Sequence, residues 1–163
     1  MHQLHGLALL LLFFVWSPLR PSVFGQGSVS WAPDGKAYYK VEAGELVQYQ
    51  LPQNTKTIFV GKAQLTPAGE SKSLSVRSFS FTADGSKVLV FTNTRKVWRM
   101  DTRGDYWVVD RKAQTLRQLG KSLKPASLMF AKFSPDGRQV AYVSEYNLYT
   151  EDLQSGHITP LTR

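Results

Sequence analysis

The densest charge of the chain lies in one short segment, Asn93 to Asp105, which reads NTRKVWRMDTRGD. Within it Arg99 directly follows Trp98. A tryptophan offers a flat apolar surface against which a guanidinium can be held. The guanidinium itself is a planar fork of donors suited to the carbonyl or carboxylate oxygens of a peptide. Arg99 is therefore the candidate substrate-binding residue.

Other residues with chemical potential give weaker indications. The chain contains no cysteine, which excludes disulfides, thiol chemistry and cysteine-based metal sites. His157, in SGHIT, has the surroundings of a turn, where a lone histidine is more often a solvated residue than a general base. We assign no catalytic residue, no metal ligand and no cofactor.

Three Asp-Gly pairs indicate the elements that must position these residues. They are Asp34-Gly35, Asp84-Gly85 and Asp136-Gly137, at offsets of 50 and 52 residues. Glycine at this place accepts the left-handed backbone that closes a hairpin, and an alternating strand follows each pair. An aromatic residue stands three positions before each aspartate, and we expect all three to face inward: Trp31, Phe81 and Phe133.

The period near 50 residues, with four short strands in each unit, predicts an all-β fold, a partial β-propeller of about three four-stranded antiparallel blades. The expected blades cover roughly residues 28–61, 76–120 and 127–162. A β-sandwich also has many short strands, but it would not repeat its turn chemistry at this spacing. Because propellers close with roughly four to eight blades, we interpret residues 26–163 as the N-terminal part of a propeller domain, a fragment of a longer protein.

One unit is longer than its neighbour. From Asp84 to the acidic turn residue Asp110 the second unit takes 26 residues, whereas the third takes 16 from Asp136 to Asp152, so ten extra residues lie within Asn93 to Asp105. The same comparison places Glu151-Asp152 on a hairpin turn rather than in a binding site. Segments that depart from a repeat often carry function. The alternatives to a functional insertion are a solvated loop without function and a strand extended for contacts between blades.

The N-terminus predicts export. Leu7 to Trp16 is an unbroken run of ten apolar residues, the length of a signal-peptide core and half of the roughly 20 residues that span a bilayer. Pro18 and Pro21 follow, and then small residues up to Gly25. We predict a signal peptide over residues 1–25 and a periplasmic or secreted protein. The run has no preceding Lys or Arg, which leaves an uncleaved membrane anchor or a buried strand as alternatives.

The net charge of +8 raises the question of a nucleic-acid partner. No run of basic residues exceeds two, and most stand beside turns. A nucleic-acid partner is therefore not expected.

Two segments, FTNTRKVWRMDTRGDYWVVD and FSPDGRQVAYVSEYNLY, resemble the propeller domain of the dipeptidyl peptidase IV subfamily of prolyl-oligopeptidase-type serine peptidases. The likeness covers roughly Val29 to Arg163. The SPDG turns are shared with TolB-like and other propellers, whereas VWR…DYWVVD is much more particular. The resemblance implies that the arginine after the tryptophan, Arg99, points into the central cavity and contacts a backbone carbonyl of the bound peptide.

The resemblance also implies parts that this sequence lacks. A glutamate pair that grips the amino terminus of the substrate lies in a later propeller segment of the family. The catalytic Ser, Asp and His lie in a C-terminal α/β-hydrolase domain, and no G-x-S-x-G elbow occurs in this chain. This chain is therefore not expected to hydrolyse peptides by itself.

The expected function is that of the N-terminal propeller of an exported serine exopeptidase, which removes dipeptides from peptide N-termini, often after proline. The propeller would gate access and bind peptides that have a free N-terminus. Its expected partners are those peptides and the hydrolase domain, and a homodimer is compatible with the sequence. The alternative is a non-catalytic, TolB-like periplasmic propeller that binds a protein, although such a blade has no need of the Trp98-Arg99 insertion.

Overall fold

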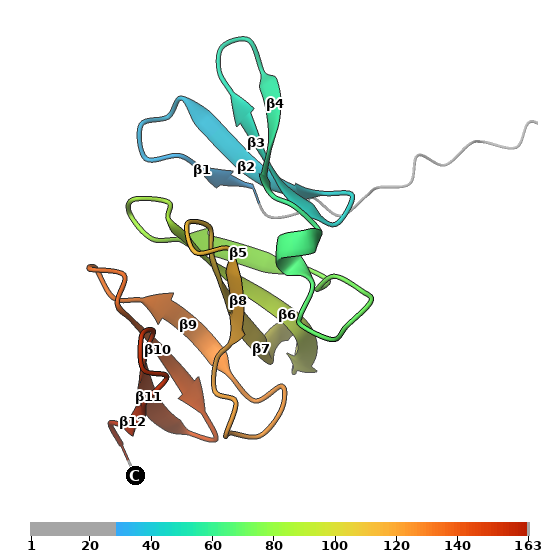
Figure 1. The fold of residues 1–163 in the computed structure, drawn as a ribbon. Helices are drawn as coiled ribbons and strands as arrows, with labels where there is room; N and C mark the ends of the chain where they lie inside the picture. Colours follow the sequence, from blue (N-terminus) through green and yellow to red (C-terminus); the bar gives the residue numbers. More distant parts are fainter. Residues whose placement is uncertain (1–28, 163) are drawn as a thin grey trace, which may run out of the picture.

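The computed structural model describes residues 29–162, so the predicted signal peptide lies outside the described residues. This part of the chain forms 12 β-strands and one short 3₁₀ helix, η1 (Ala63–Leu65). The strands make three separate four-stranded antiparallel sheets, which follow one another along the chain (Figure 1). The predicted all-β fold with three four-stranded blades is confirmed. None of the described residues belongs to a helix long and apolar enough to cross a bilayer.

Each blade is a simple meander in which every strand pairs with the next one. The first blade contains β1 (Ser30–Trp31), β2 (Ala37–Glu42), β3 (Glu45–Gln50) and β4 (Thr55–Val60). The second contains β5 (Ser78–Phe81), β6 (Lys87–Val97), β7 (Met100–Asp110) and β8 (Thr115–Gln118). The third contains β9 (Met129–Phe133), β10 (Gln139–Ser144), β11 (Asn147–Asp152) and β12 (Ile158–Pro160).

The Asp-Gly pairs join the first and second strands of each blade. Their glycines have φ of +68°, +65° and +66°, a region that residues with a side chain rarely adopt: Gly35, Gly85 and Gly137. In each turn the aspartate Oδ1 accepts the backbone N–H two residues further on, at 3.0 to 3.1 Å. This local bond holds the turn without help from the rest of the fold, which explains why the pair marks every blade.

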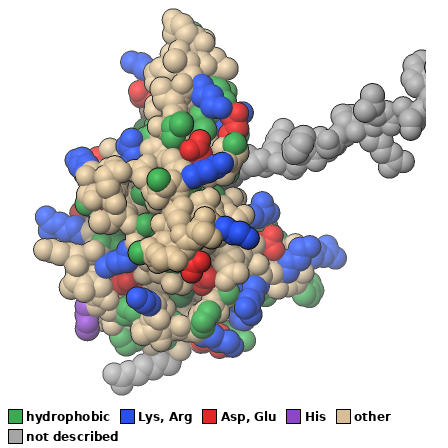
Figure 2. Space-filling model, turned by 45° about the vertical axis from the view of Figure 1, so that its right-hand side comes forward, with side chains coloured by type: hydrophobic (Ala, Val, Ile, Leu, Met, Phe, Trp, Pro, Cys, Tyr) green, Lys and Arg blue, Asp and Glu red, His purple; other side chains and the backbone are tan. Residues whose placement is uncertain are grey.

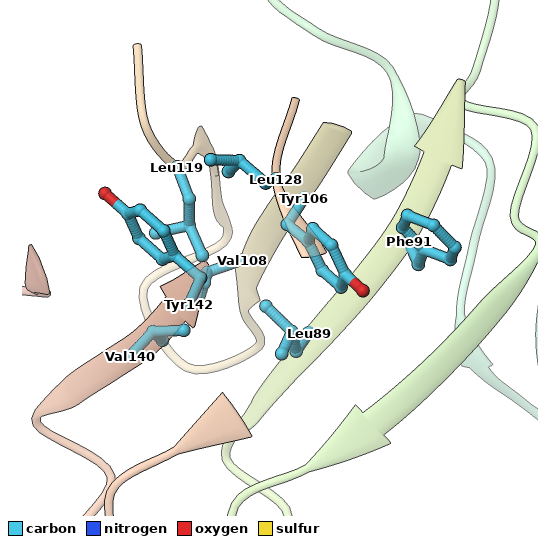
Figure 3. Close-up of a cluster of buried hydrophobic side chains, with 8 residues drawn as sticks. All are labelled: Leu89, Phe91, Tyr106, Val108, Leu119, Leu128, Val140 and Tyr142. Atoms are coloured by element: carbon cyan, nitrogen blue, oxygen red, sulfur yellow. The ribbon is translucent and has the colours of Figure 1, made fainter. Parts of the chain in front are cut away.

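The second and third blades pack face to face around a buried apolar cluster (Figure 3). Side chains of β6 and β7 meet Val140 and Tyr142 of β10, and the Phe91 and Tyr106 rings stack with centroids 4.5 Å apart. Phe133 packs against the same cluster, as predicted. The cluster consists of Leu89, Phe91, Tyr106, Val108, Leu119, Leu128, Val140 and Tyr142.

The first and second blades meet through aromatic rings and one arginine. Phe81 lies against Tyr39 and Phe59 of the first blade, with ring centroids 4.6 and 5.4 Å away. The Arg111 guanidinium stacks on the Phe59 ring at 3.6 Å and donates hydrogen bonds to the carbonyl oxygens of Phe59 and Gly85, at 3.2 and 3.1 Å. Arg111 therefore fastens the β7–β8 turn to the preceding blade.

Trp31 does not face inward, and this expectation was wrong. Its side chain is 60% exposed. Phe81 and Phe133 pair in register with Val88 and Val140, which face the preceding blade. Trp31 occupies the same place in the first blade, so it faces the side on which residues 29–162 provide no blade. The repeat predicted its position correctly, but not the neighbour that would bury it.

A charged network lies on this same exposed face. The Glu42 carboxylate accepts a hydrogen bond from the Tyr49 hydroxyl at 2.6 Å and from the Lys56 ammonium at 2.9 Å, and Lys40 lies 3.4 Å away. The hydrogen bond from Tyr49, followed by that from Lys56, lowers the pKa of Glu42 from 4.5 to about 2.

We expect this network to make folding stability depend on acidity. Because the Glu42 pKa is lowered in the folded chain, its contribution is complete above pH 4.5 and is lost as the pH falls to about 2. Melting temperatures of the wild-type chain and Glu42→Gln, measured across this window, test the expectation. The glutamine variant cannot ionise, so its melting temperature should fall less steeply. Parallel curves for the two proteins would contradict the role of Glu42.

Candidate functional site

The ten extra residues of the second unit form a hairpin extension. Strands β6 and β7 have 11 residues each, whereas their counterparts β10 and β11 have 6 each. We call residues Asn93 to Asp105 the arm. The sequence left open whether this segment is a loop or an extension of the strands. The structure shows that it extends both strands.

Trp98 and Arg99 form the tip of the arm. They are the two residues of the turn between Val97 and Met100, which pair in register. The Trp98 side chain is 94% exposed, and its backbone has φ of +64°. The same left-handed backbone occurs at turn residues of other hairpins, such as Ala43 and Tyr146, and is typical of a tight two-residue turn. The Arg99 guanidinium carbon lies 5.8 Å from the centre of the Trp98 ring, which agrees with the predicted support.

The base of the arm is tied to the linker between β8 and β9. The Asp105 carboxylate accepts hydrogen bonds from the Asn93 side-chain amide at 2.7 Å and from the backbone N–H of Ala126 at 2.8 Å. Gly104 and Leu128 exchange two backbone hydrogen bonds of 3.1 Å. These contacts fix the direction in which the arm leaves the second blade.

A second linker holds the arm nearer its tip. Arg77 precedes β5, and its guanidinium lies 3.5 Å from the Asp101 carboxylate of the arm. The ladder between the two arm strands shifts register on either side of Arg95, and Asn93 has φ of +47°. Such bulges re-aim the strand that carries them. The arm is thus a braced, redirected hairpin with a solvent-exposed tip.

The Glu151-Asp152 pair belongs to a turn and a blade interface. The Asp152 carboxylate accepts backbone N–H groups of Gln154 and Ser155 at 3.1 and 2.7 Å, so this residue does cap the predicted turn. Glu151 is only 3% exposed. The burial of this carboxylate was not predicted from the sequence. Its register partner is the inward-facing Val140, and an acidic residue opposite an inward valine is a recognisable signal.

The remaining candidates lie apart from the arm. His157 is exposed at the end of the β11–β12 turn. Within residues 29–162 no three His, Asp or Glu side chains gather as metal ligands. Figure 2 shows Lys and Arg side chains spread over the whole visible face with Asp and Glu among them, not gathered into one patch.

Comparison with known proteins identifies relatives. The family model described as "Dipeptidyl peptidase IV (DPP IV) N-terminal region" matches residues 82–163. The "probable dipeptidyl-aminopeptidase B" of Penicillium rubens is 29% identical over 162 residues, and that of Emericella nidulans is 27% identical over 144 residues. These alignments cover 91% and 83% of this chain, but 17% and 16% of the relatives. The chain thus spans about one sixth of the length of these relatives.

Solved structures show the same fold. Dipeptidyl peptidase 4 of Porphyromonas gingivalis superposes with a TM-score of 0.72 at 20% identity, over 85% of this chain and 19% of that one. A TolB from Agrobacterium tumefaciens gives a TM-score of 0.52 at 18% identity, over 84% of this chain and 46% of that one.

Proposed function

Because this chain belongs to the dipeptidyl peptidase IV family and carries part of the N-terminal propeller region, we propose that its arm binds the peptide substrates of an exported serine exopeptidase. The observation that carries the proposal is the placement of Arg99. It stands at the exposed tip of a braced hairpin, its guanidinium lies beside the Trp98 ring, and it pairs with none of the described carboxylates. Its donors are therefore available to a ligand.

The proposed chemistry follows from these donors. A peptide carbonyl oxygen accepts a hydrogen bond from the cationic guanidinium, which is stronger than a bond between neutral groups. The lateral contact with Trp98 limits the rotamers of the arginine, so less side-chain entropy is lost when a peptide binds. The arm would therefore position a peptide rather than take part in bond cleavage.

The rest of the proposed activity concerns the whole protein. Joined to a C-terminal hydrolase domain, the propeller would admit peptides, exclude folded proteins and hold substrates whose N-terminal dipeptides are removed. Export through the predicted signal peptide would place this activity in the periplasm or outside the cell. The TolB-like alternative shares the blades, but no residue of the arm favours it.

Replacing Arg99 by alanine tests the proposal in the protein that joins this region to its hydrolase domain. A hydrogen bond to a charged donor contributes about 1.5–3 kcal/mol, so kcat/KM for a Gly-Pro substrate without an acidic group should fall about ten- to a hundredfold. Arg99→Lys should restore little, because an ammonium cannot reproduce the planar fork. Steady-state kinetics and a melting curve for each variant provide the measurement.

Arg95→Ala and Arg103→Ala are the matched controls, since each removes an arginine of the same arm that does not follow the tryptophan. On a substrate without an acidic group their effect should be smaller than that of Arg99→Ala. Full kcat/KM in Arg99→Ala, or a loss explained by unfolding alone, would show that the arm is structural.

A further inference from the structure

Two arginines of the arm stand directly opposite each other. Arg95 of β6 pairs in register with Arg103 of β7. Although the ladder shifts register on either side of Arg95, this pairing places two positive charges at neighbouring positions of adjacent strands, and like charges at such positions repel each other. A bound anion would reduce this repulsion.

No described carboxylate neutralises this pair. Asp101 is opposite Lys96 in register, but its ion pair at 3.5 Å is with Arg77 of the linker before β5. Asp105 is occupied by Asn93 and by the backbone N–H of Ala126. The ion pairs found among residues 29–162 include neither Arg95 nor Arg103. Both acidic groups of the arm are thus engaged by other partners, and its cations stay available.

We propose that Arg95 and Arg103 together bind a carboxylate, so that the arm selects peptides carrying an acidic group. This inference rests on the proposed peptide-binding role of the arm. The two oxygens of a carboxylate accept charge-assisted hydrogen bonds from two guanidinium groups at once, and the anion offsets their repulsion. The group is either an acidic side chain or the C-terminal carboxylate of a short peptide.

The geometry of the arm also gives a spacing. Arg95 and Arg103 each stand four positions from Arg99 along the hairpin. At about 3.3 Å per residue, four positions cover at most about 13 Å, because part of this path is the turn at the tip. A peptide in extended conformation covers this distance in about four residues, so the carboxylate should lie three to five residues from the carbonyl held by Arg99.

Isothermal titration calorimetry with the 163-residue chain tests the inference. The probes are amidated peptides with a free N-terminus that differ only in Asp or Asn at the fourth residue after the anchoring dipeptide. We expect the Asp peptide to bind about five- to tenfold more tightly at low salt, with the difference shrinking as salt screens the charges. Arg95→Gln and Arg103→Gln should each remove this preference. Lys72→Gln, which removes an exposed cation outside the arm, should keep it.

A third peptide separates the two sources of the carboxylate. It has Asn at the test position and ends there with a free carboxylate instead of an amide. The inference is supported if one of the two acid-bearing peptides binds more tightly and Arg95→Gln removes the difference. Which of the two peptides binds more tightly identifies the source of the carboxylate. Equal affinity of all three peptides overturns the inference.

The outcomes distinguish this inference from the proposed function. If Arg99→Ala weakens every peptide and none shows an acid preference, the carboxylate pair is wrong and the peptide-binding arm stands. If the acid preference is present and Arg99→Ala has no effect, the role of Arg99 is wrong.

Arg95→Gln also removes the repulsion between Arg95 and Arg103. The melting temperature of this variant should therefore equal or exceed that of the wild type, and a lower value would count against the opposed pair.

Discussion

Replacing Gly104 by alanine should destabilise the folded chain by about 3 kcal/mol or more, at the upper end of the cost of overpacking a core. An added Cβ would lie 2.6 Å from the carbonyl oxygen of Thr92 and 2.6 Å from a ring carbon of Phe91. The first atom is backbone of the paired strand, and the second belongs to a ring that is 7% exposed in the cluster between two blades. Neither can move away without separating β6 from β7 or the second blade from the third.

Chemical denaturation of Gly104→Ala and Gly61→Ala measures this effect. Gly61 is a suitable control because an added Cβ there meets nothing closer than 3.6 Å. We expect Gly61→Ala to stay within about 1 kcal/mol of the wild type, as is usual away from special sites. Similar losses in the two variants would mean that the close approach at Gly104 relaxes at little cost.

Glu151→Ala should cost about 2–5 kcal/mol of folding free energy, because each buried donor left without an acceptor costs about 1–3 kcal/mol. Glu151 Oε2 accepts hydrogen bonds from the Gly120 N–H at 2.8 Å and from the Tyr142 hydroxyl at 3.0 Å, and Arg117 lies 3.4 Å from Oε1. Burial, followed by the nearby carboxylate, raises the pKa of Tyr142, so its hydroxyl remains a donor at neutral pH. Alanine would leave these buried donors without an acceptor between two blades.

Glu151→Gln is the informative partner of that variant. Both bonds from Gly120 and Tyr142 end on the same carboxylate oxygen, and a glutamine carbonyl oxygen can take its place. Only the contact with Arg117, which is one-third exposed, would be lost. Equilibrium unfolding should therefore rank the wild type above Glu151→Gln by about 1 kcal/mol, and both well above Glu151→Ala. Equal stability of the two variants would show that the buried hydrogen bonds contribute little.

The features that the sequence predicted are those with a local cause. Each Asp-Gly turn is closed by its own aspartate and needs no distant partner, so the three turns and the strands beside them could be located from spacing alone. The length difference between units likewise located the arm, because a repeat makes an insertion visible. The position of Arg99 beside Trp98 follows from adjacency in the sequence.

The features that escaped prediction depend on neighbours distant in the chain. Trp31 has the same place in its blade as Phe81, but its burial depends on a preceding blade. The braces of the arm come from two separate linkers, through Arg77 and Ala126, and no local pattern links these to Asp101 or Asp105. Glu151 was interpreted as a turn residue because its neighbour Asp152 is a turn residue.

The two interfaces between blades are held by different groups, so each blade fits only its own neighbour. Tandem units of similar shape risk exchanging places during folding, either within one chain or between chains. In the second interface the Glu151 carboxylate meets an N–H group and an arginine that the second blade supplies. In the first, Arg111 stacks on Phe59 and no carboxylate is buried. A third blade docked on the first would leave its carboxylate with only the Tyr142 hydroxyl of its own blade as a donor, without the N–H group and the arginine. Mispaired assemblies are therefore penalised, and the order of the blades along the chain is preserved in space.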